Sequence, residues 1–189
     1  MKSDHDWRIL SSENICETPH LRVERQRIAT PTRPDGVSWI VAQRHTAAVV
    51  APRTVDGKFI LIRQERLAVQ RVLWEFPAGQ VDGEVNPTTI YEAAMRELGE
   101  EAGVLCPQEL IPLGYFYSSV GFTNECGHLF LARDVVPREE GFDHDEHEAI
   151  LEVRAFSEEE LADLIGAGEI VDSNTLATYA RLKARRFIE

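Results

Sequence analysis

The sequence predicts an α/β fold, with a mixed β-sheet sandwiched between helices and an N-terminal antiparallel β subdomain. Three observations predict this class. Strand-like apolar runs stand both before and after one amphipathic helical segment at 86–103, two further helical segments follow the last run, and residues 21–29 alternate apolar and polar side chains. Helices on both sides of a sheet are a stable layered arrangement. We therefore divide the chain into a β subdomain, 1–45, and a larger domain, 46–189.

Composition limits the classes of function. The chain has 189 residues, 43% hydrophobic and 28% charged, and its formal net charge of −12 argues against a nucleic-acid or anionic-membrane partner. The N-terminus lacks an apolar signal core, and no segment is long enough to span a bilayer. Three cysteines show no metal or disulfide spacing, and their odd number fits a reducing compartment. We expect a cytoplasmic protein.

The segment before the helix predicts strands and turns. Residues from about 7 to 45 indicate two or three strands, with a turn at Pro34–Gly36. From Thr46 a more buried run, T-A-A-V-V-A, leads to a turn at Asp56–Gly57. The run K-F-I-L-I-R-Q that follows predicts a strand of the central sheet.

Arginines follow that strand closely. Arg63 and Arg66, with Gln64 between them, stand at its end, and Arg71 lies just beyond. They form either a solvated strand terminus or a phosphate clamp beside the loop at Gly79. Because arginine binds phosphate oxygens bidentately, and because the acidic helix is near in sequence, we favour the clamp.

The central helix carries acidic side chains on its apolar face. Asn86 suits the N-cap, Pro87 the first helical position and Gly103 the end. At about 100° per residue, two glutamates fall inside the apolar stripe and a third falls at its border. The apolar stripe consists of Ile90, Ala93, Ala94 and Leu98, and the acidic residues are Glu97, Glu101 and, at the border, Glu100.

Buried carboxylates need a compensating cation, which is either Arg96 or a bound metal. Glutamates at i, i+3 and i+4 place their oxygens on one patch, which suits Mg²⁺, with Mn²⁺ as the alternative. The competing interpretation is a solvated acidic helix end. A glycine-containing loop leading into the helix favours the metal site.

After the helix, strand-like runs at 111–120, 126–135 and 150–156 enclose a long acidic loop. This loop is either a flexible surface loop or a mobile segment that delivers Glu148, or else Glu146, over the metal cleft. Ser157 and Glu160 predict a capping box for the next helix, and a last helix at about 173–187 is basic toward its end.

The segment R-E-L-G-E-E-A-G-V, 96–104, resembles the second half of the Nudix box, with Gly79 as the opening glycine. The interval from Gly79 to Arg96 is three residues longer than the family pattern, so that Glu84 is the nearest substitute for the first glutamate of the box. The resemblance implies the Nudix fold, a divalent metal, and Glu97, Glu100 and Glu101 as metal ligands and catalytic residues.

The flanking motifs are similar to the ADP-ribose pyrophosphatase branch, through L-I-R-Q-E-R and W-E-F-P-A-G before the box and G-E-I-V-D-S-N-T after it. This resemblance implies a homodimer in which the N-terminal subdomain lends substrate contacts. By matching position it implies several site residues: Trp39 on the base, Arg44 and Arg66 on the diphosphate, Glu75 and Gly79 at the substrate, and the Ala78 carbonyl on a metal. For the catalytic glutamate that takes the proton of the water we expect either Glu100 or, from the acidic loop, Glu148 in preference to Glu146.

The activity that this resemblance implies is metal-dependent hydrolysis of the diphosphate bond of a nucleoside diphosphate sugar, with ADP-ribose giving AMP and ribose 5-phosphate. The branch usually carries a proline where Val120 stands. Another sugar nucleotide such as GDP-mannose therefore stays open as the substrate, as does a non-catalytic Nudix-fold ligand sensor.

Overall fold

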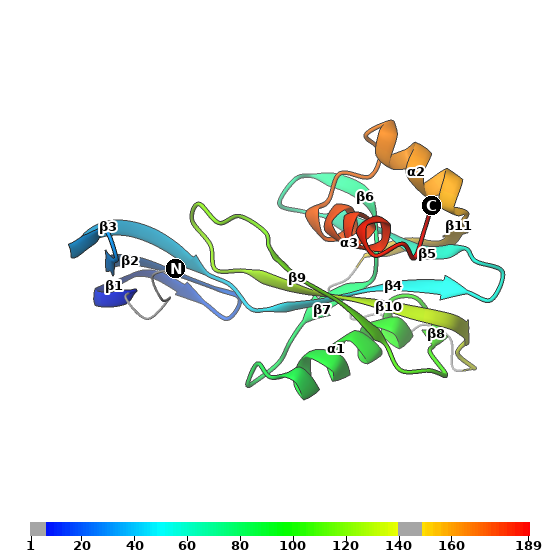
Figure 1. Ribbon diagram of the computed structural model, residues 1–189, viewed down its shortest axis with the longest axis horizontal. Helices are drawn as coiled ribbons and strands as arrows, with labels where there is room; N and C mark the ends of the chain where they lie inside the picture. The colour runs from blue at the N-terminus through cyan, green and yellow to red at the C-terminus, as the bar shows by residue number, and fades with distance from the viewer. Residues whose placement is uncertain (1–6, 140–148) are drawn as a thin grey trace. The chain divides into compact units, whose positions relative to one another are not determined.

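The computed structural model describes residues 7–139 and 149–189, and Figure 1 shows the order of its elements. The chain forms two compact units. One comprises Met1–His45 with Tyr117–Cys126, and the other comprises Thr46–Phe116 with Gly127–Glu189. The N-terminal unit thus includes a segment, Tyr117–Cys126, that the sequence analysis placed in the larger domain.

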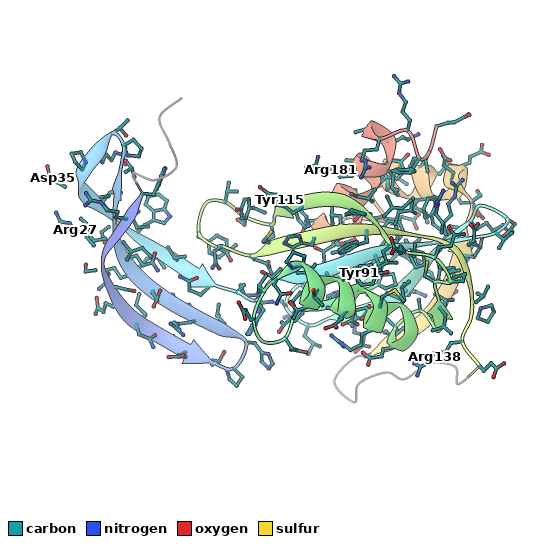
Figure 2. All side chains as sticks on the ribbon, turned by 60° about the horizontal axis from the view of Figure 1, so that its bottom comes forward. Arg27, Asp35, Tyr91, Tyr115, Arg138 and Arg181 are labelled. Atoms are coloured by element: carbon teal, nitrogen blue, oxygen red, sulfur yellow. The ribbon has the colours of Figure 1, made fainter. Side chains whose placement is uncertain are left out.

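The N-terminal unit contains three antiparallel strands in the order β1-β2-β3, namely β1 (Arg8–Thr18), β2 (Leu21–Thr30) and β3 (Arg33–Gln43). The turn predicted at Pro34–Gly36 is wrong, because Thr30 pairs with Arg33 and the chain reverses between them. Pro34–Gly36 instead lies inside β3. There Gly36 takes a φ of 81°, and the Arg27 guanidinium donates to the Asp35 carbonyl at 2.8 and 3.0 Å. Figure 2 labels Arg27 and Asp35 on this three-stranded sheet.

The larger unit is built on a mixed sheet in which β10 runs parallel to β4 and the other paired strands are antiparallel. Its main path is β11-β5-β4-β10-β8, and three further strands pair at its sides. The strands are β4 (Ala47–Thr54), β5 (Phe59–Arg66), β6 (Arg71–Glu75), β7 (Ala78–Gln80), β8 (Val104–Leu105), β9 (Ile111–Tyr117), β10 (Cys126–Pro137) and β11 (Ile150–Phe156).

The helices of the described residues are α1 (Pro87–Glu100), α2 (Glu158–Gly166) and α3 (Ser173–Ala184). Asn86 caps α1 as predicted, by accepting hydrogen bonds from Thr88 N and Thr89 N. The predicted capping box of α2 is present, and α3 ends three residues earlier than the sequence indicates. None of these helices is long and apolar enough to cross a bilayer.

Two hydrophobic clusters fill the two faces of this sheet. Residues of β4, β5 and β10 face α1 on one side, where Tyr91 packs edge-on against Phe130. Their alternate neighbours face α2 and α3 on the other side. Figure 1 shows α1 and the pair α2–α3 on opposite sides of the strands. The predicted sandwich of helices around a mixed sheet is therefore confirmed.

Candidate active site

The site is organised by the close contact between β7 and α1. Gly79 lies in β7, which pairs with β4, and a Cβ atom at Gly79 would stand 1.6 Å from Oε1 of Glu97. Only glycine allows the strand to approach the helix this closely. The opening glycine of the sequence motif therefore serves to bring the backbone of β7 against a helix carboxylate.

The predicted helix glutamates occupy the positions that the periodicity indicated. Glu97 and Glu101 are 2% and 1% exposed, within the same helix face as buried Leu98, whereas Glu100 is partly exposed. Oε2 of Glu101 accepts a hydrogen bond from the Ala78 amide at 2.7 Å. Two buried carboxylates are thus fixed directly beside the 78–80 backbone.

Arg96 supplies a positive charge to this cluster. Its Nη2 lies 2.6 Å from Oε1 of Glu97, and its Nη1 lies 2.6 Å from Oε2 of Glu100. Burial disfavours the charged guanidinium, but Glu97 and Glu100 outweigh that effect and raise the pKa of Arg96. Of the two compensating cations that the sequence allowed, the structure shows the arginine.

The donor chemistry also fits a hard divalent cation. Glu97, Glu100 and Glu101 offer carboxylate oxygens on consecutive turns of one helix, and the Ala78 backbone is adjacent. The Arg96 guanidinium pairs with Glu97 and Glu100, and the charge of Glu101 also stabilises Arg66. Within 7–139 and 149–189, however, no three acidic, histidine or cysteine side chains converge as a complete metal-ligand set.

A second charged pair lies at the end of β5. Arg66 donates from Nε to both oxygens of Glu75, at 2.9 and 3.1 Å, and from Nη2 to Oε2 at 2.5 Å. Burial disfavours its charge, but the hydrogen bond and charge of Glu75 prevail and raise the pKa of Arg66. Glu75 is 2% exposed and is engaged with Arg66.

Beside this pair, Arg71 stands opposite Arg66 across the β5–β6 hairpin. Both arginines line a hollow of about 290 Å³. Arg63 is directed differently, since it lies 3.6 Å from Glu152 and stacks over Trp74. The structure therefore brings together only part of the predicted arginine clamp.

The sequence analysis missed two residues at the start of α3. Asp172 caps the helix by accepting from Thr175 N at 2.8 Å, and the fully buried Thr175 hydroxyl accepts from Phe76 N at 2.9 Å. Burial, followed by the charge of Glu75, raises the pKa of Asp172 from 3.8 to about 6. Both residues lie in the motif G-E-I-V-D-S-N-T, 168–175, to which the sequence analysis assigned no individual roles, and an aspartate just before a predicted helix indicates a cap rather than a site.

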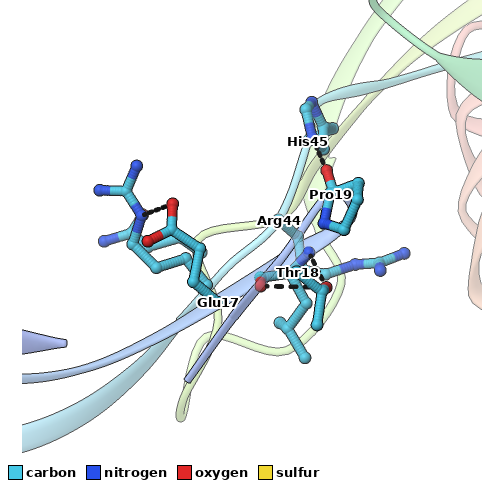
Figure 3. Close-up of a pocket in the computed structure, with 8 residues that line it drawn as sticks. Glu17, Thr18, Pro19, Arg44 and His45 are labelled. Atoms are coloured by element: carbon cyan, nitrogen blue, oxygen red, sulfur yellow. Dashed lines mark hydrogen bonds and ion pairs between the residues drawn. The ribbon is translucent and has the colours of Figure 1, made fainter. Parts of the chain in front are cut away.

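Two other predicted contacts belong to the N-terminal unit. Trp39 is 51% exposed, and its Nε1 donates to the Gly121 carbonyl at 2.7 Å. The Arg44 side chain lies 3.3 Å from Glu125 and donates to the His20 carbonyl. Arg44 also lines a hollow of about 470 Å³, which Figure 3 shows with Glu17 and His45.

Three further glutamates were named in the sequence analysis, and the structure describes one of them, Glu84. Glu148 and its alternative Glu146 lie outside the described residues. Glu84 is exposed, and its carbonyl accepts from the Thr89 hydroxyl at 2.7 Å just before α1. Glu84 therefore contributes a backbone contact at the start of the helix.

The sheet between helices and the glutamates of α1 define an α/β protein with an acidic, oxygen-rich site. Comparison with known proteins then identifies the family, because a model of the NUDIX domain matches residues 43–179. The chain is 32% identical to an ADP-ribose pyrophosphatase of Bacillus subtilis over 77% of each chain. It belongs to the NUDIX family and is a Nudix hydrolase.

Other relatives cover more of the chain. A methanol dehydrogenase activator of Bacillus methanolicus is 30% identical over 95% of this chain and 94% of its own length. An ADP-ribose pyrophosphatase of Mycobacterium tuberculosis is 29% identical over 93% and 82%. A solved structure described as an ADP compounds hydrolase matches both chains completely, with a TM-score of 0.76 at 21% identity, which shows the shared fold.

Proposed function

We propose that this Nudix hydrolase cleaves the diphosphate bond of a nucleoside diphosphate sugar, with ADP-ribose giving AMP and ribose 5-phosphate. The observation that carries the proposal is the burial of Glu97 and Glu101 on one helix face against Gly79 and the Ala78 amide. The relatives named ADP-ribose pyrophosphatase, from two organisms, support the substrate.

The carboxylates of α1 account for the metal dependence of the proposed reaction. Glu97, Glu100 and Glu101, with the Ala78 carbonyl, would hold Mg²⁺, or alternatively Mn²⁺. When bound, the cation supplies charge neutralisation at the diphosphate oxygens and lowers the pKa of a coordinated water. Arg96 lies 2.6 Å from both Glu97 and Glu100 and keeps these carboxylates oriented.

A water attacking phosphorus must lose a proton. Glu100 is suited to accept it, because it is the partly exposed member of the helix cluster. Glu148, which lies outside the described residues, is the alternative base. Replacing Glu148 by glutamine distinguishes the two. A large loss of kcat would assign the base to Glu148, and a kcat near the wild type would leave Glu100, whose own replacement would also disturb the metal site.

Arginines hold the substrate in this proposal. Arg66 and Arg71 line one hollow, and Glu75 fixes the Arg66 guanidinium through Nε and Nη2. Bidentate contact with phosphate oxygens is the strength of arginine. Trp39 on the base and Arg44 on the diphosphate stay predictions for the N-terminal unit.

A homodimer is also proposed. Strand β1 is exposed along its whole length, and its apolar side chains Ile9, Leu10 and Ile15 are 60%, 46% and 48% exposed. An exposed edge strand with apolar side chains favours pairing with another chain. Sedimentation at several protein concentrations tests the dimer, and a monomer throughout would contradict it.

The function is tested by measuring turnover of ADP-ribose with Mg²⁺, with Mn²⁺ and with chelator. An added phosphatase releases phosphate from the products AMP and ribose 5-phosphate, and this phosphate is measured. We expect metal-dependent turnover, and a loss of at least about 100-fold in Glu101→Gln, because removing even a partner of a metal ligand costs 10–100-fold. Glutamine preserves an acceptor for the Ala78 amide. A folded Glu101→Gln protein with wild-type turnover would refute the proposal.

Two alternatives are distinguished by running the same assay on ADP-ribose, GDP-mannose and other sugar nucleotides, and a third needs a separate assay. Preferred turnover of GDP-mannose or another sugar nucleotide would keep the mechanism and change the substrate. Tight ADP-ribose binding without turnover would indicate a ligand sensor. The relative named methanol dehydrogenase activator supports a further role, which is tested by adding this protein to a methanol dehydrogenase assay.

A further inference from the structure

Hydrogen bonds, together with the peptide bond between Glu75 and Phe76, connect the start of α3 to the Arg66 guanidinium. Asp172 accepts from Thr175 N at 2.8 Å, and the Thr175 hydroxyl accepts from Phe76 N at 2.9 Å. Phe76 follows Glu75 in the chain, and Glu75 holds Arg66 through both carboxylate oxygens. The start of α3 is thus linked to the end of β6, and the end of β6 is linked to the end of β5.

Burial makes this connection sensitive to the hydroxyl of Thr175. Thr175 and Phe76 are both 0% exposed, so water cannot replace the acceptor that the Phe76 amide uses. Glu75 is 2% exposed and lies at the end of β6, immediately before this amide. A displacement of Phe76 would therefore move the carboxylate that orients Arg66.

Buried polar atoms and charged side chains surround this connection. Oδ2 of Asp172 and Oε1 of Gln64 are buried, and neither has a hydrogen-bond partner within the described residues. Gln64 precedes Arg66 by two positions in β5, so their side chains share a face of the sheet. Glu75, Glu101 and Asp172 all stabilise the positive charge of Arg66.

We propose that Thr175, oriented by Asp172 at the start of α3, is a positioning residue that holds Glu75 and, through it, the Arg66 guanidinium for the diphosphate of the substrate. The role in ligand binding rests on the proposed function, whereas the positioning of Arg66 does not. Within the described residues no hydrogen bond joins Thr175 to Arg66, and Thr175 acts through the Phe76 amide.

The test compares variants with and without a hydroxyl group at position 175. Thr175→Val and Thr175→Ala remove the acceptor, and Thr175→Ser keeps it. Thr178 supplies the matched control, because it is also 0% exposed on α3 and its hydroxyl donates within the helix to the Asn174 carbonyl at 2.7 Å. Thr178→Val therefore makes the same chemical change without touching β6.

The first readout needs no ligand. Hydrogen exchange of the Arg66 Nε–H, followed by NMR and assigned by its loss in Arg66→Lys, reports the bond to Glu75 directly. We expect exchange to be about tenfold faster in Thr175→Val and Thr175→Ala, the size of one buried hydrogen bond. Thr175→Ser and Thr178→Val should match the wild type. If the valine variant does not fold, the alanine variant alone is used for this measurement. An unchanged exchange rate of the Arg66 Nε–H in Thr175→Ala would overturn the positioning role.

The second readout separates KM from kcat with ADP-ribose and Mg²⁺. We expect KM to rise about tenfold in Thr175→Ala while kcat changes less than about twofold. The reason is that this variant displaces Arg66, which binds the substrate, and leaves the carboxylates of α1 in place. Faster Arg66 exchange with unchanged KM would overturn the link to the substrate. A wild-type protein that does not turn over ADP-ribose would refute the proposed function, and the exchange readout would still decide the positioning of Arg66.

Discussion

Replacing Asp172 by asparagine isolates the free-energy cost of a buried charge in this site. Asparagine caps helices as well as aspartate does, so the bond to Thr175 N at 2.8 Å has an acceptor in both proteins. The change replaces the ionisable carboxyl group by a neutral amide of nearly the same shape. Burial and the charge of Glu75 hold the pKa of Asp172 at about 6, instead of its usual 3.8.

The magnitude follows from proton linkage. The folded state binds the Asp172 proton more tightly than the unfolded state, so this carboxyl contributes stability that is complete below pH 3.8 and is lost as the pH rises through about 6. A difference of about two pKa units corresponds to about 3 kcal/mol. About 2 kcal/mol of that falls between pH 4.5 and pH 7.5. Asp172→Asn does not titrate and should gain this amount relative to the wild type over the same interval.

Urea unfolding at pH 4.5, 6.0 and 7.5 in the presence of chelator measures the difference. The control is Asp163→Asn, which makes the same change at an exposed position of α2 and corrects for the net charge of −12. An advantage of Asp172→Asn that stays within about 0.5 kcal/mol from pH 4.5 to 7.5, which is ordinary for surface substitutions, would refute the reasoning.

Two glycine substitutions should separate activity from stability. In Gly79→Ala the new Cβ would meet Glu97 Oε1, the end of a side chain that can move, so we expect a fall in turnover of more than about tenfold with little change in the urea midpoint. In Gly127→Ala the Cβ would stand 2.4 Å from the Phe116 ring, so we expect a loss of about 1–3 kcal/mol in the free energy of unfolding. Gly166→Ala, where no atom lies within 4 Å, is the control for both, and equal effects at all three positions would contradict the steric argument.

The central helix could be predicted because its signals are local. Asn86 and Pro87 fix its start, and the spacing of apolar residues identifies the face that meets the sheet. The same spacing placed Glu97 and Glu101 on the buried face, where the structure has them. Periodicity within a single helix needs no knowledge of the rest of the fold.

Contacts that join distant segments could not be predicted in this way. The bond between Phe76 and Thr175 spans 99 positions. Each residue lies in a family-like motif, W-E-F-P-A-G or G-E-I-V-D-S-N-T, but neither motif indicates that the two residues meet. The expected turn at Pro34–Gly36 failed for a related reason. Proline, aspartate and glycine are common in turns, and the sequence analysis therefore placed the chain reversal at Pro34–Gly36. The pairing of β2 with β3 places it earlier in the chain, between Thr30 and Arg33.

Glu75 and Glu97, which precede and follow Gly79 in the chain, have different physical roles. The sequence analysis assigned the first to the substrate and the second to a metal. Glu75 is engaged through both oxygens with Arg66, so it orders a guanidinium. Glu97 shares Arg96 with Glu100 and adjoins the backbone of β7, so a divalent cation would meet its oxygens already oriented. Because each charged group is held by a partner of opposite sign, little rearrangement is required when a metal-bound diphosphate arrives. Such preorganised charge is the main source of stabilisation for phosphoryl-transfer transition states. The arginine pairs therefore belong to the proposed site together with the carboxylates: Glu75 orders Arg66 for binding the diphosphate, and Arg96 orders Glu97 and Glu100 for the cation.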